Sequence, residues 1–314
     1  MLFGLHLAAV MTAGIMGSSF NLSFWSNYER MGGIFDLAHW FALAAVLVFT
    51  VKSLGEWKAT ASISLIFGLA AAFLGLAEKY DYDVVNYLQG ADRVSGATGN
   101  PSFLAGHMMV NAMLALALLG DRLKGIRLKR TLMSESIAAF YIFTALISIW
   151  VLSETGSKGS MLGLLVGLVV GVGFHSIFSG HKRIRIVALA LTVAIPAAVF
   201  ILLLARDTSA VQDLASRNIL VNRLVSVRRD NESSLLRSLG LRISGQAFLA
   251  RPITGWGGEN FEVPFQRYQR EGEIRAKGEI LDRAHNKPLD LLATTGILGF
   301  STYLALWGWI GVLA

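Results

Sequence analysis

The sequence contains no cysteine among its 314 residues, and charged residues make up only 16% of it. The missing cysteine excludes a disulfide, a thiolate metal site and a thiol nucleophile. The low charge content is unusual, because about 25% of the residues in a soluble domain are charged. Hydrophobic residues, by contrast, make up 54% of the chain. This balance indicates that apolar solvent surrounds much of the protein.

No cleavable signal pattern, internal repeat or low-complexity tract is visible either. The chain begins inside one apolar run and ends inside another, from Leu304 to Ala314, so we expect a fragment of a longer protein. The formal net charge is +7, but the basic residues are unevenly distributed. We interpret them below through membrane topology, and we expect no nucleic-acid partner.

Long apolar runs between charged residues are the main feature of the chain. A helix needs about 20 mostly apolar residues to cross a bilayer, whereas barrel strands show only short alternating patterns. We therefore predict an all-α polytopic membrane protein with about eight transmembrane helices, part of a roughly twelve-span protein. The predicted spans are Leu2–Phe20, Ile34–Val51, Thr60–Leu76, Phe103–Leu119, Ile137–Leu152, Met161–Phe178, Ile184–Ala205 and Leu289–Leu313.

Basic residues in the short linkers predict the orientation. The linkers after the second, fourth and sixth spans are basic and are placed in the cytoplasm; they carry Lys52, Lys58, Arg122, Lys124, Arg127, Lys129, Arg130, Lys182, Arg183 and Arg185. The alternate linkers then face outside. The predicted organisation is residues 1–205 with spans one to seven, a large external loop over residues 206–287, and residues 288–314 as a truncated eighth span.

Acidic residues gather in one external linker, which holds Glu78, Asp81, Asp83 and Asp92. Such a group could suggest a metal site. Solvation of the loop is the simpler interpretation, so we predict no metal ion and no cofactor.

The large external loop is rich in arginine, whose planar fork of donors grips phosphate in bidentate fashion. A lipid-linked phosphate or diphosphate would suit such a cluster near the membrane. A solvated face with ion pairs to the acidic residues of the loop is the alternative. Those acidic residues are Glu259, Glu262, Glu271, Glu273 and Glu279.

One part of the loop predicts a surface helix lying along the membrane. Asn231 or Ser233 can cap it, and Pro252 and the following glycines end it. Its apolar stripe consists of Leu236, Leu239, Ile243, Ala247 and Ala250, at three- and four-residue spacing. Arg237 lies in the first turn, where free amides also attract anions.

A short polar segment, residues 283–288, precedes the last span. Asn286 is expected to cap that span, with Pro288 in its first turn. His285 would lie at the external interface, where an imidazole can take a proton from an attacking hydroxyl, although a hydrogen-bonded structural histidine remains open. Gly296 follows eleven residues later and is expected below His285 on the same helix face.

These motifs resemble the O-antigen ligase and O-antigen polymerase superfamily. That superfamily carries His, then Asn, Ser or Gln, nine residues, Gly, two residues, and Gly, Thr or Tyr; His285, Asn286, Gly296 and Gly299 match throughout. Its second marker, an external arginine followed four residues later by leucine, is matched by Arg237 and Leu241. Three further segments resemble its external loops: residues 28–33, 93–101 and 251–261. One departure is Lys158, where relatives commonly have arginine.

The resemblance implies a lipid-dependent, all-helical glycosyltransferase in the bacterial cytoplasmic membrane. Its donor would be a glycan on undecaprenyl diphosphate, and its acceptor a hydroxyl of lipid A core, a glycan or a protein. The catalytic residues would be His285, as base, and Arg237, at the departing diphosphate. Arg30, Arg93 and Arg283 are expected to hold the diphosphate, with inversion at the sugar and no metal.

Two other classes stay open on the residues alone. A transporter of lipid-linked glycans should place polar groups deep within its spans. The spans are nearly free of charge, and the main polar pair is His107 and Asn111, which we expect near the outer half or between helices. A purely structural scaffold explains neither the His285 motif nor the arginine-bearing helix.

Overall fold

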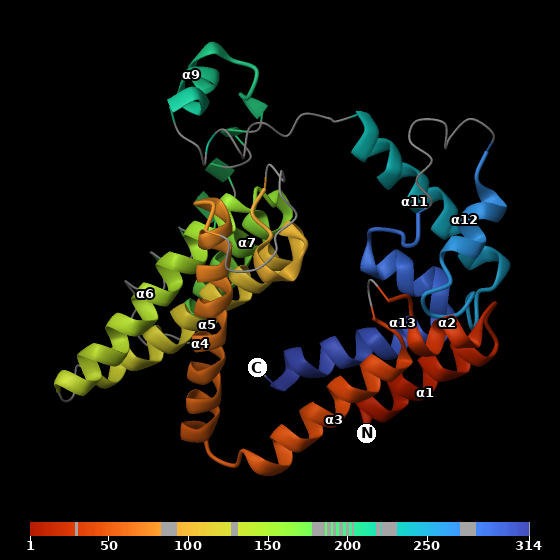
Figure 1. The fold of residues 1–314 in the computed structure, drawn as a ribbon, viewed down its shortest axis with the longest axis horizontal. Helices are drawn as coiled ribbons and strands as arrows, with labels where there is room; N and C mark the ends of the chain where they lie inside the picture. Colours follow the sequence, from red (N-terminus) through yellow and green to blue (C-terminus); the bar gives the residue numbers. More distant parts are fainter. Residues whose placement is uncertain are drawn as a thin grey trace. The chain divides into compact units, whose positions relative to one another are not determined.

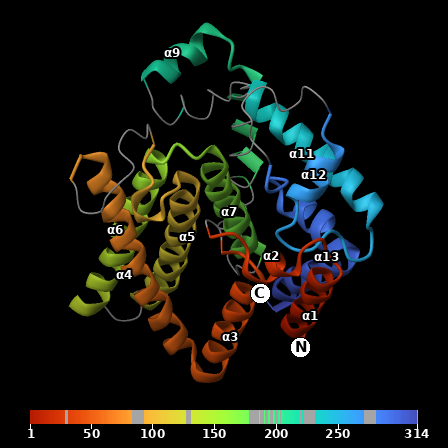
Figure 2. The ribbon, with the colours of Figure 1, turned by 45° about the vertical axis from the view of Figure 1, so that its right-hand side comes forward.

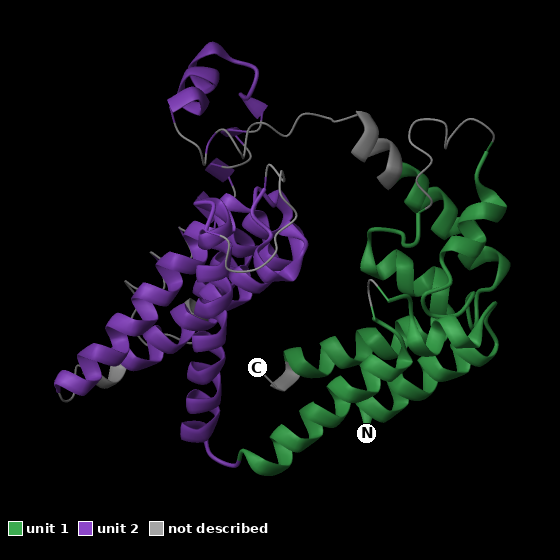
Figure 3. Ribbon diagram, in the orientation of Figure 1, with its two compact units in different colours: residues 1–51, 229–314 green, residues 52–228 purple. Residues whose placement is uncertain are grey.

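The computed structural model describes residues 1–28, 31–82, 93–126, 131–177, 204–217, 231–270 and 281–313, with scattered positions between 186 and 221. Side chains at 124–126, 174–177, 231–237 and 312–313 fall outside this description. Within it the secondary structure is helical and contains no strand, which confirms the predicted all-α class. The chain divides into two compact units, Met1–Val51 with Arg229–Ala314, and Lys52–Arg228 (Figure 3).

The unit Lys52–Arg228 is built around four apolar helices: α4 (Leu54–Lys79), α5 (Pro101–Ile126), α6 (Leu132–Glu154) and α7 (Lys158–Ile177). Helix α5 packs against the other three, so it lies at the centre of the group. A capping box starts α4. The Ser53 hydroxyl accepts from the amide of Glu56, and the Glu56 carboxylate accepts from the amide of Ser53. The shorter helix α9 (Ser209–Arg217) also belongs to this unit.

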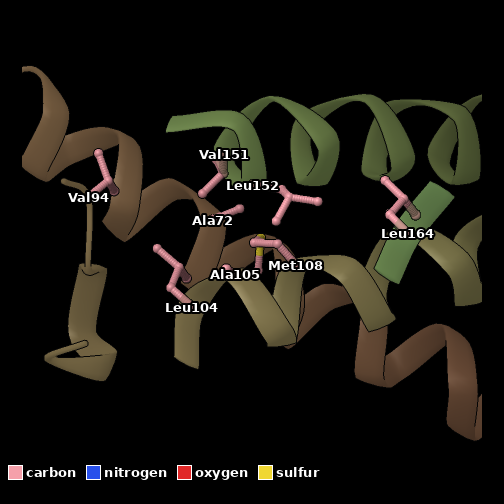
Figure 4. Close-up of a cluster of buried hydrophobic side chains, with 9 residues drawn as sticks. Ala72, Val94, Leu104, Ala105, Met108, Val151, Leu152 and Leu164 are labelled. Carbon is pink, nitrogen blue, oxygen red and sulfur yellow. The ribbon is translucent and has the colours of Figure 1, made fainter. Parts of the chain in front are cut away.

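Small and flexible side chains form the core between these helices. Ala72, Ala105 and Met108 meet Val151 and Leu152 in one buried cluster (Figure 4). Small residues let helix backbones approach closely, which is how helices associate inside a membrane. The pairing is regular, and no break interrupts α4, α5 or α6 in the part of the chain that is described.

The polar pair of α5 has one buried member. Asn111 is buried and its Nδ2 donates to Ser148 Oγ of α6 at 2.9 Å. Gly68 of α4 lies so close to this amide that a Cβ there would overlap it. The expectation that Asn111 packs between helices is therefore confirmed, whereas His107 is exposed.

Glu78, at the end of α4, holds the external loop that follows it. Its carboxylate accepts from the amide of Ser95 at 2.7 Å, from Ser95 Oγ at 3.0 Å and from the amide of Gly96. This carboxylate thus orders the loop before η1 (Gly96–Thr98). Asp83 and Asp92, named with it above, lie outside the described residues.

The unit of the two chain ends combines three apolar helices with the polar segment that was predicted to be external, of which residues 231–270 and 281–286 are described. Helix α1 (Leu2–Ile15) packs against both α3 (Ile34–Thr50) and α13 (Lys287–Leu313), and these three run side by side in Figure 1. His6 of α1 and Thr302 of α13 share a buried hydrogen bond of 2.8 Å. The chain just beyond α1 reaches the first part of α13 through Trp256, which accepts from Ser18 and donates to the Ala293 carbonyl, so the two helices are antiparallel. Helices α11 (Asn231–Ala250) and α12 (Glu262–Tyr268) lie against the first part of α13 (Figure 2).

The first predicted span is too long. Helix α1 ends at Ile15, and Ser19 starts the separate helix α2 (Phe20–Trp25) by accepting from the amide of Leu22 at 3.3 Å. The corner reads Met16-Gly17-Ser18-Ser19, so a glycine and a capping serine mark the boundary that the hydropathy of the longer run obscured.

Of the described residues, four helices are long and apolar enough to cross a membrane: Leu54–Lys79, Pro101–Leu123, Leu132–Glu154 and Lys287–Gly311. They correspond to the third, fourth, fifth and eighth predicted spans. Shorter apolar helices occupy the first, second and sixth, at Leu2–Ile15, Ile34–Thr50 and Lys158–Gly173. The seventh prediction, Ile184–Ala205, lies mostly outside the described residues.

Candidate functional site

Helix α11 is the platform of the site. Three members of its predicted stripe, Leu239, Ile243 and Ala247, are buried against Phe261, Phe265 and the start of α13, which confirms the stripe. Ala250 is exposed, so the prediction was wrong at the last turn, where the helix ends and the chain turns away.

Helix α13 is broken at Gly296, which has φ +61° and ψ −164°. The break corrects the expectation that Gly296 lies below His285 on one continuous helix face, since His285 precedes the helix and the helix is interrupted before it can carry that register. No room is left for a lipid tail at this glycine either. A Cβ there would overlap the carbonyl of Ile253, so only glycine fits.

The turn at residues 252–257 fills the break with backbone hydrogen bonds. The amides of Ile297 and Leu298 donate to the carbonyls of Pro252 and Ile253 at 2.8 and 3.2 Å. In return, the amides of Trp256 and Gly257 donate to the carbonyls of Ala293 and Thr294 at 3.1 and 2.8 Å. Unpaired backbone groups are costly in an apolar setting, and this exchange satisfies those that the break leaves free.

The same turn also reaches α1. The amide of Ser18 donates to the Trp256 carbonyl at 2.8 Å, and a Cβ on Gly17 would lie 2.6 Å from Gly257 Cα. Gly255, Gly257 and Gly296 all have positive φ, which glycine adopts without strain. The two glycine-containing segments that carry the family resemblance are therefore parts of one joint between the external segment and the apolar helices.

His285 projects from the loop in front of α13. It has φ +51°, a left-handed conformation that is rare outside glycine, and its side chain is exposed. No hydrogen bond or ion pair of its imidazole occurs within the described part of the chain. Strained, exposed residues of this kind cluster at functional sites. The imidazole is free to meet a substrate.

The neighbours of His285 are fixed on both sides. On the helix side, Asn286 Oδ1 accepts from the amide of Leu289 at 3.3 Å, which is the predicted cap, and the buried Asp290 accepts from the amide of Ala284. On the α11 side, a Cβ on Gly240 would lie only 2.8 Å from the Ala284 carbonyl oxygen. The loop thus rests directly on α11.

Arg283 is held by Glu259. The guanidinium Nη2 lies 2.6 Å from Glu259 Oε2, and both side chains are largely buried. Glu259 itself has φ +63° and accepts from Ser26 Oγ at 2.7 Å. The pair ties the segment after α2, the glycine turn and the His285 loop together, which is the ion-pair alternative raised for the arginines. A contact of Arg283 with diphosphate is a separate question and stays a prediction.

Arg237 lies on α11, three residues before Gly240. Residues three apart share a helix face, so its backbone is one turn from the point where α11 meets the His285 loop. Leu241, the second residue of the arginine motif, is exposed. The structure therefore places the Arg237 backbone one helical turn from the His285 loop, and the direction of its side chain lies outside the described residues.

Arg93 and Arg30 are the other predicted diphosphate ligands. Arg93 belongs to the unit Lys52–Arg228, where its Nε donates to the Thr155 carbonyl at 2.7 Å and lies beside Gly156. It thereby joins two of the short external segments, residues 93–101 and 155–159. Arg30 lies outside the described residues.

Two contributors were missed by the sequence-based reasoning: Ser26 and Asp290. Ser26 binds Glu259, and Asp290 is buried behind the His285 loop. An acidic residue in the first turn of an apolar helix is a recognisable signal, because it also complements the helix dipole. Nothing in the sequence marks Ser26. As for a metal site, no group of three or more suitable side chains lies among the described residues.

Apolar helices of membrane-spanning length, joined to a polar segment that presents an exposed histidine, define an integral membrane protein. The chain belongs to the O-antigen ligase family, whose model matches residues 143–304, slightly more than half of the sequence. The match includes α11, the glycine turn, the His285 loop and the break of α13. No curated protein and no solved structure gave a significant match.

Proposed function

We propose that this protein transfers a glycan from undecaprenyl diphosphate to an acceptor hydroxyl on the outer face of the bacterial cytoplasmic membrane. His285 is the base and Arg237 the cation that receives the leaving group. The conformation of His285 carries the proposal, since the imidazole is exposed on a left-handed residue whose neighbours are fixed. Membership of the O-antigen ligase family supports the reaction class.

In the proposed reaction, His285 accepts the proton of the acceptor hydroxyl as its oxygen bonds to the anomeric carbon. The bond from that carbon to the diphosphate oxygen breaks, and the diphosphate keeps the electron pair. A single displacement inverts the anomeric configuration. The charge that develops on the diphosphate is stabilised by Arg237, a preorganised cation, so this mechanism uses no metal ion.

Ligation to lipid A core is our first choice of acceptor, followed by polymerisation onto a growing glycan and transfer to a protein hydroxyl. These outcomes share the donor chemistry and differ only in acceptor contacts, which lie in external segments that vary freely on one fold. Arg30, Arg93 and Arg283 are the proposed additional ligands of the diphosphate. The external placement of residues 206–287 is part of the proposal.

The test supplies the protein in membranes with a glycan on undecaprenyl diphosphate and one acceptor at a time. We expect release of the lipid diphosphate together with glycan-modified acceptor. The product size separates a single transfer from polymerisation. If the lipid-linked glycan crosses the bilayer without being cleaved under any acceptor, the chain is a transporter and the proposal is wrong.

A further inference from the structure

The corner between α11 and the glycine turn exposes apolar side chains next to unneutralised cations. Leu249 and Ile253 are 78% and 67% exposed. Arg251 stacks on the Trp256 ring at 4.4 Å, and Arg267 lies 5.7 Å from the same ring. Neither guanidinium forms an ion pair with a carboxylate in the part of the chain that is described.

This corner lies at the end of the apolar helices of its unit. Ile253 and Pro252 accept from amides just beyond the break of α13, and Trp256 accepts from Ser18, just beyond α1. Helices α1 and α13 are antiparallel, so the C-terminal end of α1 and the break of α13 meet at the same turn. Gly14 and Ile34, in contact, bring the start of α3 to that end too.

Helix α3 is shorter than the hydrocarbon core of a bilayer. Its 17 residues cover roughly 25 Å at 1.5 Å per residue, against about 30 Å for the core. Bilayer thinning or apolar residues beyond the helix ends can make up such a difference. Ile253 is an exposed apolar residue of this kind.

We propose that residues 249–256, with Arg267, form an interfacial membrane anchor. Leu249 and Ile253 enter the acyl boundary, and Arg251 and Arg267, which the buried Trp256 ring holds in place, bind the phosphates of bilayer lipids. Exposed apolar side chains beside cations are a composition that binds a phospholipid interface. The anchor would hold α11 and the His285 loop at a fixed height, and it does not depend on which reaction the protein catalyses.

The absence of cysteine gives a direct test, because a single introduced thiol carries one spin label. The Ile253→Cys and Lys287→Cys proteins are labelled in phospholipid bilayers, and collisions with oxygen and with a water-soluble nickel chelate are compared. We expect oxygen to dominate at position 253 and the chelate to dominate at position 287, which begins α13 and is exposed. Equal chelate access at both positions would overturn the anchor, whatever the catalytic activity.

The cations are tested with the same label. Raising the fraction of phosphatidylglycerol should move the label at position 253 deeper. Arg251→Glu should abolish this response, whereas Arg217→Glu, a charge-matched change on α9, should keep it. If Arg251→Glu keeps the lipid response but loses donor binding, the cation serves the donor and its assignment to bilayer phosphate is wrong. If Arg251→Glu misfolds, the Ile253→Cys protein that keeps Arg251 still tests the apolar contact, because its label should collide more with oxygen than with the chelate.

Discussion

The two units of the chain differ in how regular their backbones are. In Lys52–Arg228, α4, α5 and α6 are unbroken and meet through small side chains and a buried hydrogen bond from the Asn111 amide to the Ser148 hydroxyl. In the other unit, α13 is broken at Gly296, and four backbone hydrogen bonds join the residues around the break to the turn at residues 252–257. Of the five described non-glycine residues with positive φ, four lie there: Ser26, Met31, Glu259 and His285.

This difference separates a scaffold from a site. Regular helix packing needs no strained residue, and strain persists only where the surrounding contacts impose it. Here the surrounding contacts are the joint at Gly296, the Glu259–Arg283 ion pair and the contact of the His285 loop with α11 at Gly240. We therefore expect changes in this unit to alter glycan transfer, and changes in the helix core of the other unit, away from Arg93, to alter stability alone.

After His285 itself, Arg237 should give the largest loss. Removing one preorganised electrostatic contact costs about 10²–10³ in rate, so Arg237→Ala should lower transfer by roughly that factor. Arg237→Lys should recover only part of it, because lysine lacks the bidentate fork. Initial rates of undecaprenyl diphosphate release measure both. Arg217→Ala, on α9, is the matched control and should transfer normally; full activity in Arg237→Lys would argue against bidentate contact.

Gly296→Ala should be the most damaging change to stability. A Cβ overlaps the Ile253 carbonyl and φ is +61°, so the change should destabilise the protein by more than the roughly 1 kcal/mol that an unstrained glycine-to-alanine change can add to stability. Thermal unfolding in detergent, followed by tryptophan fluorescence, measures the shift. Gly308→Ala has open space around its Cβ and should be neutral or slightly stabilising. If the Gly296→Ala protein is as stable as the Gly308→Ala protein, the close packing of the turn against Gly296 is wrong.

Breaking the Glu259–Arg283 pair should have a moderate effect on transfer. A hydrogen bond to a charged group contributes about 1.5–3 kcal/mol, so Glu259→Gln and Arg283→Gln should each lower the transfer rate by up to roughly tenfold to a hundredfold. If the pair only positions the His285 loop, the double substitution should be no worse than either single one. Additive losses would instead assign Arg283 a role of its own, consistent with diphosphate binding.

The smallest effect on transfer is expected in the other unit. Asn111→Ala removes the bond to Ser148 and leaves space beside Gly68, so stability should fall by about 1 kcal/mol. The transfer rate per folded molecule should stay at the wild-type value. Unfolding curves together with activity normalised to folded protein measure this. A specific loss of transfer would break the division between scaffold and site.

The sequence alone was sufficient for local features. Hydropathy predicted the apolar helices, four-residue spacing predicted the buried face at Leu239, Ile243 and Ala247, and the position of Asn286 predicted a cap. Each of these depends on neighbours within a few residues, so periodicity and capping chemistry are enough to find them.

Long-range features could not be predicted in this way. Gly296 sits in an apolar run that looks like one continuous helix, and its positive φ is imposed by the turn at Pro252 and Ile253. Glu259 and Arg283 are 24 residues apart, and Ser26 is a further 233 from Glu259. Spacing rules do not reach across such distances, which is why the joint and the Ser26 contact were missed.

The most direct test of the account compares His285→Ala with His39→Ala in the same bilayers. His39 is an exposed histidine of α3 that bonds to the Phe35 carbonyl, so it controls for loss of an imidazole. With donor and acceptor supplied together, we expect His39→Ala to release undecaprenyl diphosphate at the wild-type rate and His285→Ala to fall by about 10²–10⁴. Release by His285→Ala at the wild-type rate would contradict the proposed base and, with it, the placement of the chemistry in this loop.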